Sequence, residues 1–194
     1  MYDCGITAKA FIETIRAEAD ISMPVPDASY LRWINTVEQF LYAEILEEYV
    51  SVTLPWAGET LALTEIGEGV IYDDIVSVYG DDAELDRAGV IAGTDVTDRP
   101  MYWTDYRGNL VLRMPETPSE VTVVYRLRPA LKKDGTENIC IPSEWLDMLA
   151  ARLRAEAYKI ANEDGQAGKW MQDYNAQLET FRIWAARRNE RYGR

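Results

Sequence analysis

The apolar residues of this 194-residue chain change their spacing twice along the sequence. Residues 1–49 and 129–194 repeat them every three or four positions, which is typical of amphipathic helices. Residues 50–128 instead carry short alternating runs separated by glycine and proline, which is typical of strands and turns. We therefore predict an α+β fold in which a helical bundle, built from both ends of the chain, carries an inserted small antiparallel β-sheet or sandwich at 50–128.

Two helices are expected in the N-terminal part of the bundle. The apolar stripe of the first consists of Ala8, Phe11, Ile12, Ile15 and Ala19. The following MPVP ends it, because proline disfavours a helical conformation at the residue before it. Asp27 is the expected N-cap of the second helix. The stripe of this second helix consists of Leu31, Ile34, Val37, Leu41 and Ile45.

Two further helices are expected after residue 140. Pro142 and Ser143 predict the start of the first, through a preset backbone dihedral and through capping. Gly165 and Gly168 predict its end. The apolar positions of the long last helix are Trp170, Tyr174, Leu178, Phe181 and Ala185. The apolar signal then stops near Trp184, so we expect packing within the subunit to explain this helix only up to that residue.

Turn and loop residues divide the middle segment. Gly108 and Asn109 predict a hairpin turn between two strands. The acidic stretch GDDAELD (80–86) is expected to be a solvated loop. Asp73 with Asp74, and Asp81 with Asp82, are expected to lie on the solvated surface or in a turn.

Charge is distributed unevenly in this chain of formal net charge −13. Residues 1–151 hold 11 basic and 27 acidic residues, a net of −16, whereas residues 152–194 hold 9 basic and 6 acidic residues, a net of +3. The acidic composition of residues 1–151 argues against nucleic-acid binding across their surface, because such binding requires clustered lysine and arginine. The last residues, FRIWAARRNERYGR, contain five arginines and one glutamate, so residues 182–194 are predicted to be an interaction tail.

Catalytic motifs are missing from the sequence. Without histidine there is no Ser-His or Cys-His nucleophile and no histidine ligand for zinc. Neither a Walker loop nor a dinucleotide-binding glycine motif is present. Cys4 and Cys140 fit no metal spacing and are expected to be reduced thiols. We predict that the protein is not an enzyme and has no cofactor.

A calcium site is one alternative to this negative conclusion. Asp82, Glu84 and Asp86 imitate the first three ligand positions of a calcium loop. Positions six and twelve hold Arg87 and Gly93 instead of the required glycine and glutamate. A weak site for a divalent cation therefore remains an alternative.

The N-terminus has no basic region followed by an apolar run, so no signal peptide is expected. No apolar stretch approaches the ~18 residues that span a bilayer. We expect a soluble protein, made in a reducing cytoplasm and independent of membranes.

The order of motifs along the chain resembles a known arrangement. An aromatic-rich strand from Trp103 is followed by an RGN turn, LVLRMP, VTVVYRLRPAL, the charged loop KKDGTEN, ICIPSEWLDML and a paired-helix tail. With the N-terminal LRWINTVEQFLYAEI, this layout resembles the head–tail connector (adaptor) proteins of tailed bacteriophages. The resemblance covers nearly the whole chain in its apolar positions, turns and lengths, and the middle sheet matches only loosely.

The resemblance implies a structural virion protein of the phage neck. Subunits of that family form a ring, typically of twelve, beneath the portal protein, where the ring extends the DNA channel and docks tail or nozzle proteins. Because arginine binds carboxylates and aromatic side chains add buried area, we expect an acidic groove on the portal to be bound by Phe181, Arg182, Trp184, Arg187, Arg188, Arg191, Tyr192 and Arg194. The resemblance implies that the C-terminal helix or tail makes this contact. It also suggests acidic residues that face the channel and let DNA pass without specific binding, namely Asp81, Asp82, Glu84 and Asp86.

Other functions stay open at this point. A small-terminase-like DNA-packaging ring would use the basic tail on phosphates, and salt-dependent duplex binding would reveal it. A carbohydrate- or calcium-binding module would use the aromatic sheet, and its binding signal would depend on Trp103. A hydrolase is the least favoured because histidine is absent.

Overall fold

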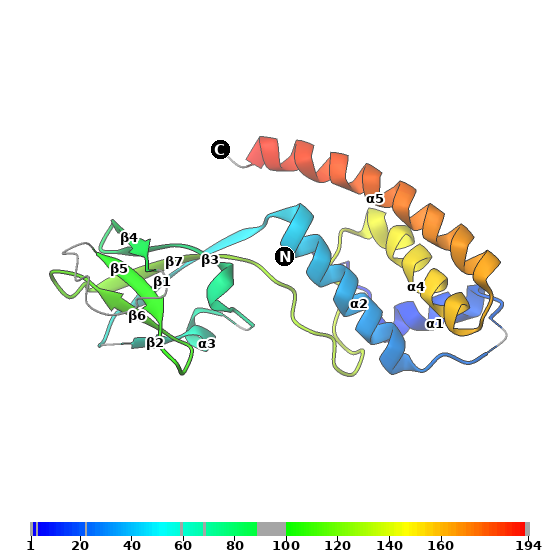
Figure 1. Ribbon diagram of the computed structural model, residues 1–194, viewed down its shortest axis with the longest axis horizontal. Coiled ribbons are helices and arrows are strands. Elements are labelled where there is room, and N and C mark those ends of the chain that lie inside the picture. The colour runs from blue at the N-terminus through cyan, green and yellow to red at the C-terminus, as the bar shows by residue number, and fades with distance from the viewer. Residues whose placement is uncertain are drawn as a thin grey trace. The chain divides into compact units, whose positions relative to one another are not determined.

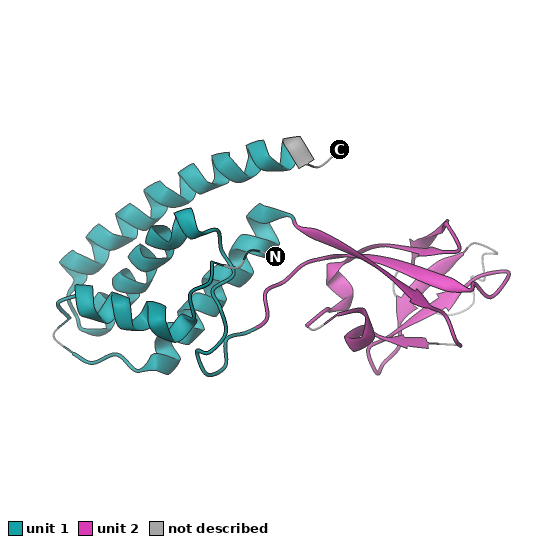
Figure 2. Cartoon of the chain, turned by 180° about the vertical axis from the view of Figure 1, so that it is seen from behind, with its two compact units in different colours: residues 1–47, 131–194 teal, residues 48–130 magenta. Residues whose placement is uncertain are grey.

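The long helices and the strands occupy separate parts of the chain in the computed structural model. The structure describes residues 2, 4–21, 23–58, 60–67, 69–88 and 100–192, without the side chains of 191 and 192. The chain forms two compact units. Residues 1–47 and 131–194 form the helical unit, and residues 48–130 form the β unit (Figure 2). Within the described residues, no helix has both the length and the apolar character needed to cross a bilayer.

The helical unit is built from four α-helices and two short irregular turns (Figure 1). Its elements are α1 (Ala8–Glu18), α2 (Asp27–Leu41), the π-helical turn η1 (Tyr42–Leu46), the 3-10 turn η3 (Ser143–Trp145), α4 (Leu146–Ile160) and α5 (Asp164–Tyr192). Its core includes the fully buried residues Ile15, Ile34, Leu41, Leu46, Met148, Leu149, Leu153 and Phe181. The expected helices at both ends of the chain are therefore present.

Two of the predicted helix boundaries are wrong. Pro26 is the N-cap residue of α2, and Asp27 is its first helical residue. The carboxylate of Asp27 caps nothing and instead pairs with Arg16 at 2.5 Å. The break before α5 lies at Asn162, which has φ +59°, because asparagine tolerates the left-handed conformation. Gly165 and Gly168 are both inside α5.

The β unit is a curled seven-stranded sheet in the order β1-β7-β3-β4-β5-β6-β2. The strands are β1 (Tyr49–Pro55), β2 (Thr60–Ala62), β3 (Ile75–Gly80), β4 (Ala83–Arg87), β5 (Met101–Thr104), β6 (Asn109–Arg113) and β7 (Glu120–Arg126). Two short elements, α3 (Leu63–Ile66) and a 3-10 turn (Tyr72–Asp74), accompany them. The buried core of this unit includes Leu61, Ile75, Val78, Tyr102, Leu110, Val121 and Val123. The predicted antiparallel arrangement holds except for β4 and β5, which pair in parallel.

The stretch 80–86 is a hairpin rather than the expected loop, and the turn expected for Asp81 and Asp82 is confirmed. Asp81 and Asp82 have φ +44° and +71°, as the two central residues of a type I′ hairpin turn require. This two-residue turn joins β3 to β4, so Glu84 and Asp86 lie on a strand. The turn predicted at Gly108 is confirmed by its φ of +79°, and Asn109 begins β6.

The adjacent aspartates of the 3-10 turn have different surroundings. Asp74 is buried and pairs with Arg128, whose Nε donates to it at 2.7 Å. Asp74 therefore lies in a turn, which is one of its two expected places, but not on the solvated surface. Asp73 is exposed and pairs with Arg87 at 3.0 Å.

Candidate docking surface

The C-terminal half of α5 contributes aromatic side chains to the helical core. Phe181 is fully buried and meets Trp145 edge to face, with ring centroids 5.1 Å apart. Trp184 is half-buried and stacks on Phe181, with a centroid distance of 5.4 Å. Aromatic pairs of this geometry add to the energy of area burial. Phe181 therefore has no free surface to offer a partner, and its assignment to the portal contact is revised to a core role.

Packing within the unit continues past Trp184, which corrects the expectation that it stops there. Ala185 is fully buried. The guanidinium of Arg188 lies 5.2 Å from the ring centroid of Tyr2. The amide of Asn189 donates to the carbonyl of Ile45 at 3.4 Å or, turned over, to that of Leu46 at 3.2 Å. Asn189 thereby donates a hydrogen bond to a carbonyl group at the end of η1, because the last carbonyl groups of a helix have no intrahelical donor.

One side of α5 stays exposed near its end. We call Arg182, Ile183, Ala186 and Arg187 the C-terminal face: all four are exposed, and Ala186 and Arg187 lie three or four positions after Arg182 or Ile183, a spacing that makes residues neighbours on a helix surface. Ile183 is 55% exposed. Arg182 pairs with Glu179 of the same helix at 2.5 Å, and Arg187 makes no ion pair within the described residues. The face therefore combines an apolar centre with two exposed cations.

Three of the sequence-predicted docking residues cannot be placed on this face. The side chains of Arg191 and Tyr192 lie outside the described part of the chain, and so does all of Arg194. Of the remaining members, Arg182 and Arg187 are exposed, while Trp184 and Arg188 are half-buried.

The acidic residues predicted to face a channel lie in or beside the β3–β4 hairpin. Asp81 accepts hydrogen bonds from Ser119 N at 3.0 Å, Ser119 Oγ at 2.8 Å and Glu120 N at 3.2 Å. The bonds from Ser119, followed by that from Glu120, lower the pKa of Asp81. Asp82, Glu84 and Asp86 are exposed. The described residues contain no group of three or more His, Cys, Asp or Glu side chains that could hold a metal.

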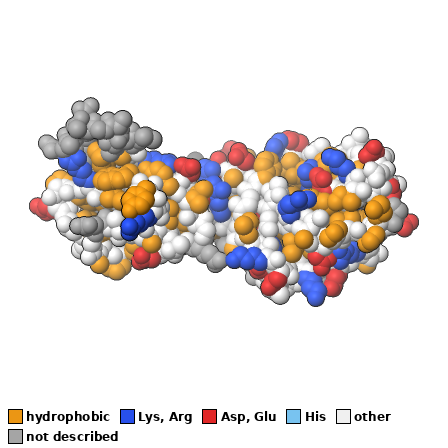
Figure 3. All heavy atoms as spheres, turned by 60° about the horizontal axis from the view of Figure 1, so that its bottom comes forward, with side chains coloured by type: hydrophobic (Ala, Val, Ile, Leu, Met, Phe, Trp, Pro, Cys, Tyr) orange, Lys and Arg blue, Asp and Glu red, His pale blue; other side chains and the backbone are white. Residues whose placement is uncertain are grey.

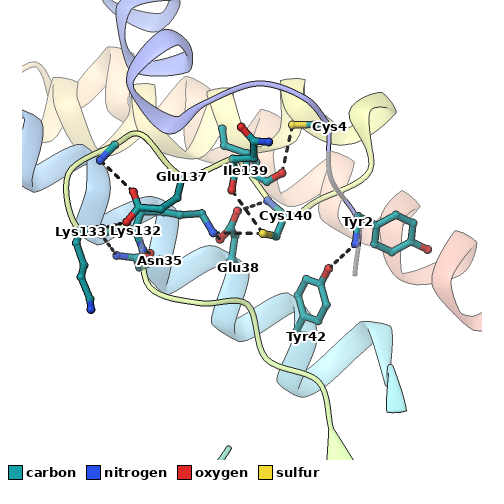
Figure 4. Close-up of polar contacts among 12 residues, drawn as sticks. Tyr2, Cys4, Asn35, Glu38, Tyr42, Lys132, Lys133, Glu137, Ile139 and Cys140 are labelled. Atoms are coloured by element: carbon teal, nitrogen blue, oxygen red, sulfur yellow. Dashed lines mark hydrogen bonds and ion pairs between the residues drawn. The ribbon is translucent and has the colours of Figure 1, made fainter. Parts of the chain in front are cut away.

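A buried polar cluster connects α2 to the segment that follows β7 (Figure 4). Lys132 Nζ lies 2.7 Å from Glu38 Oε2 and 3.3 Å from Cys140 Sγ, and Cys140 N donates to Glu38 Oε1 at 2.6 Å. Burial raises the pKa of Glu38 against the opposing effects of Lys132 and Cys140 N–H. Burial alone would lower the pKa of Lys132, but the hydrogen bond and charge of Glu38 outweigh it and raise that pKa.

A groove of about 640 Å³ lies along the exposed side of α2 and is the feature that sequence reasoning missed. We call it the α2 groove; it is lined by Ala28, Leu31, Arg32, Asn35, Thr36, Gln39, Leu131, Lys132 and Lys133. Figure 3 shows one face of the protein, on which hydrophobic side chains are interspersed with both basic and acidic ones. The helix residues are spaced at three and four positions, but their mixed polarity gives no apolar stripe.

Residues 6–194 match the sequence model of a protein family described as SU10 adaptor protein. No curated protein matches the chain.

Proposed function

Because this chain belongs to the SU10 adaptor protein family, a family of phage head–tail adaptors, we propose that it forms a ring beneath the portal, extends the DNA channel and docks the tail. The observation that carries this proposal is the family match, which covers residues 6–194 and so includes both units. A ring of about twelve copies in the neck of the virion is the assembly that we propose, since identical subunits close into rings through head-to-tail contacts.

We assign the portal contact to the C-terminal face. Arginine side chains bind carboxylates through paired hydrogen bonds, which suits Arg182 and Arg187 to an acidic groove. An exposed ion pair is worth only about 0.2–1 kcal/mol, so the charges alone do not hold a complex together. Fully burying an isoleucine side chain contributes about 1.5–3 kcal/mol, and covering Ile183, which is 55% exposed, adds about half of that. The repetition of weak contacts around a ring multiplies the affinity.

The exposed carboxylates of the β3–β4 hairpin support passage of DNA rather than its retention. Where Asp82, Glu84 and Asp86 face the channel, they repel phosphate groups, and the duplex slides past without specific contacts. This repulsion reaches only about 8 Å at physiological salt, so it acts only from residues on the channel wall. The role that we propose is structural and requires no catalytic group.

The test mixes the protein with the portal of the same phage and images the complexes by electron microscopy. The wild-type chain is expected to form a ring stacked coaxially on the portal, and Arg182→Glu/Arg187→Glu to lose this binding. Lys159→Glu/Lys169→Glu is the matched control, since it makes the same charge change at two exposed lysines elsewhere in the unit. If the wild-type protein does not stack on the portal, the proposal of an adaptor ring is overturned. A double variant that binds normally overturns only the assignment of the C-terminal face.

A further inference from the structure

The wall of the α2 groove is held in place before anything binds. Lys132 N donates to Asn35 Oδ1 at 2.7 Å, and Asn35 Nδ2 donates back to the Lys132 carbonyl at 3.0 Å. The side chain of Lys132 then ends in the buried contact with Glu38. A surface fixed in this way loses little conformational entropy when it is covered, so its contacts contribute more of their energy to binding.

The chemistry of the α2 groove is that of an interface for an acidic, partly apolar surface. Leu31 is half-buried, while Leu131 is 56% exposed at the edge. Arg32 and Lys133 are exposed beside them, and within the described residues neither side chain makes an ion pair. Carboxylates that approach these two cations would bring apolar atoms onto the leucines, which is how polar rims and apolar centres combine at interfaces.

The charge of the chain identifies the occupant. Residues 1–151 carry a net charge of −16, so another copy of the same protein is the nearest source of an acidic surface at high local concentration. A closed ring needs two different surfaces on each subunit, one that receives the neighbour and one that is received. The α2 groove spans about 17 Å of helix at 1.5 Å per residue, which is long enough to contact three turns of an incoming helix.

We propose that the α2 groove receives a second copy of this chain and forms one side of the subunit contact in the ring. The inference rests on the proposed function, because it places the groove between ring neighbours. It names Arg32 and Lys133 as the groups that pair with carboxylates of the neighbour, and Leu131 as the apolar residue that becomes covered.

A carbodiimide crosslinker tests this contact, because it joins a lysine to a carboxylate only when the two are in direct contact. Copies labelled with ¹⁴N and ¹⁵N are mixed, crosslinked and digested. We expect the peptide that contains Lys133 to be linked to an acidic peptide of the opposite label. In parallel, Arg32→Glu/Lys133→Glu is expected to weaken self-association at least tenfold by light scattering. Lys159→Glu/Lys169→Glu, with the same charge change, is expected to leave it unaltered.

Each other outcome separates this contact from the ring itself. Oligomers that survive Arg32→Glu/Lys133→Glu, with no mixed-label crosslink at Lys133, overturn the groove contact and leave the ring in place. If the protein forms its ring only on the portal, the same crosslinking experiment is carried out on that complex. A link from Lys133 to an acidic peptide of a neighbouring copy supports the inference, and a link from Lys133 to a portal peptide overturns it. A chain that forms no ring in either setting overturns the proposed function as well.

Discussion

The ammonium group of Lys132 lies 2.7 Å from the carboxylate of Glu38, and each side chain is only 1% exposed. This pair attaches the segment after the β unit to α2, so its integrity matters to the helical unit. Lys132→Met leaves the carboxylate buried without its counter-ion, and we expect a loss of about 3–5 kcal/mol in the free energy of unfolding. Urea unfolding followed by circular dichroism at the helical minimum measures it.

The double variant Glu38→Gln/Lys132→Met supplies the control for this pair. Glutamine removes the charge and keeps an oxygen that accepts from Cys140 N, so we expect the double variant to lose less than Lys132→Met alone. Equal losses in the two variants would show that the lysine contributes packing rather than charge compensation.

Phe181 distinguishes a core residue from a docking residue. Because its ring is fully buried against Trp145 and Trp184, Phe181→Ala is expected to cost about 3–5 kcal/mol of unfolding free energy. Arg187→Ala, on the exposed side of the same helix, is expected to change it by less than about 0.5 kcal/mol. If Phe181→Ala kept full stability and lost only portal binding, the aromatic ring would belong to the interface after all.

Asp81 makes the β unit sensitive to acid. Its pKa in the folded protein is lowered, so its contribution to stability is fully present above the ordinary aspartate pKa of 3.8 and is lost as the pH falls through the lowered value. Asp81→Asn is therefore expected to be less stable than wild type at pH 7, and the difference should shrink below that ordinary pKa. Urea unfolding at a series of pH values measures the difference in unfolding free energy between Asp81→Asn and wild type.

Asp82→Asn is the control for this acid sensitivity. Asp82 is the other central residue of the same turn and is exposed, so its substitution is expected to change the free energy of unfolding by less than about 0.5 kcal/mol. A gap for Asp81→Asn that persists unchanged in acid would contradict the role of its carboxylate.

Much of the fold could be predicted from local patterns in the sequence, and the predictions that failed did so for physical reasons. The helices at both ends and the turn at Gly108 follow from spacing and from glycine, which act over a few residues. The break at Asn162 was missed because asparagine, rather than glycine, adopts positive φ there. The strand β4 was missed because Leu85 is the one large apolar residue in it. The pair of Glu38 and Lys132 joins distant segments, which spacing does not reveal. For the docking surface, the stripe of α5 marked Phe181 as apolar but could not distinguish core from interface.

The break between α4 and α5 gives a direct test of the backbone at Asn162. Its φ of +59° suits glycine and asparagine, so Asn162→Gly is expected to change the unfolding free energy by only a few tenths of a kcal/mol. Asn162→Val places a β-branched side chain in the left-handed region and is expected to cost about 1–2 kcal/mol. Thermal unfolding of both variants measures the difference. Equal stability would mean that the turn relaxes to an ordinary conformation.

Removing the end of α5 affects folding as well as docking. A chain that ends at Arg187 loses the contact of Arg188 with Tyr2, worth about 0.5–1 kcal/mol, and the hydrogen bond of Asn189 to η1, worth about 0.5–1.5 kcal/mol. We therefore expect the truncated subunit to be about 1–2.5 kcal/mol less stable in urea. A cycle of Arg188→Ala and Tyr2→Ala should return a coupling energy near 0.5–1 kcal/mol, and a truncation with unaltered stability would contradict both contacts. Since truncation weakens the subunit itself, loss of portal binding in that variant could come from either cause, whereas charge reversal at Arg182 and Arg187 acts on the exposed face of α5.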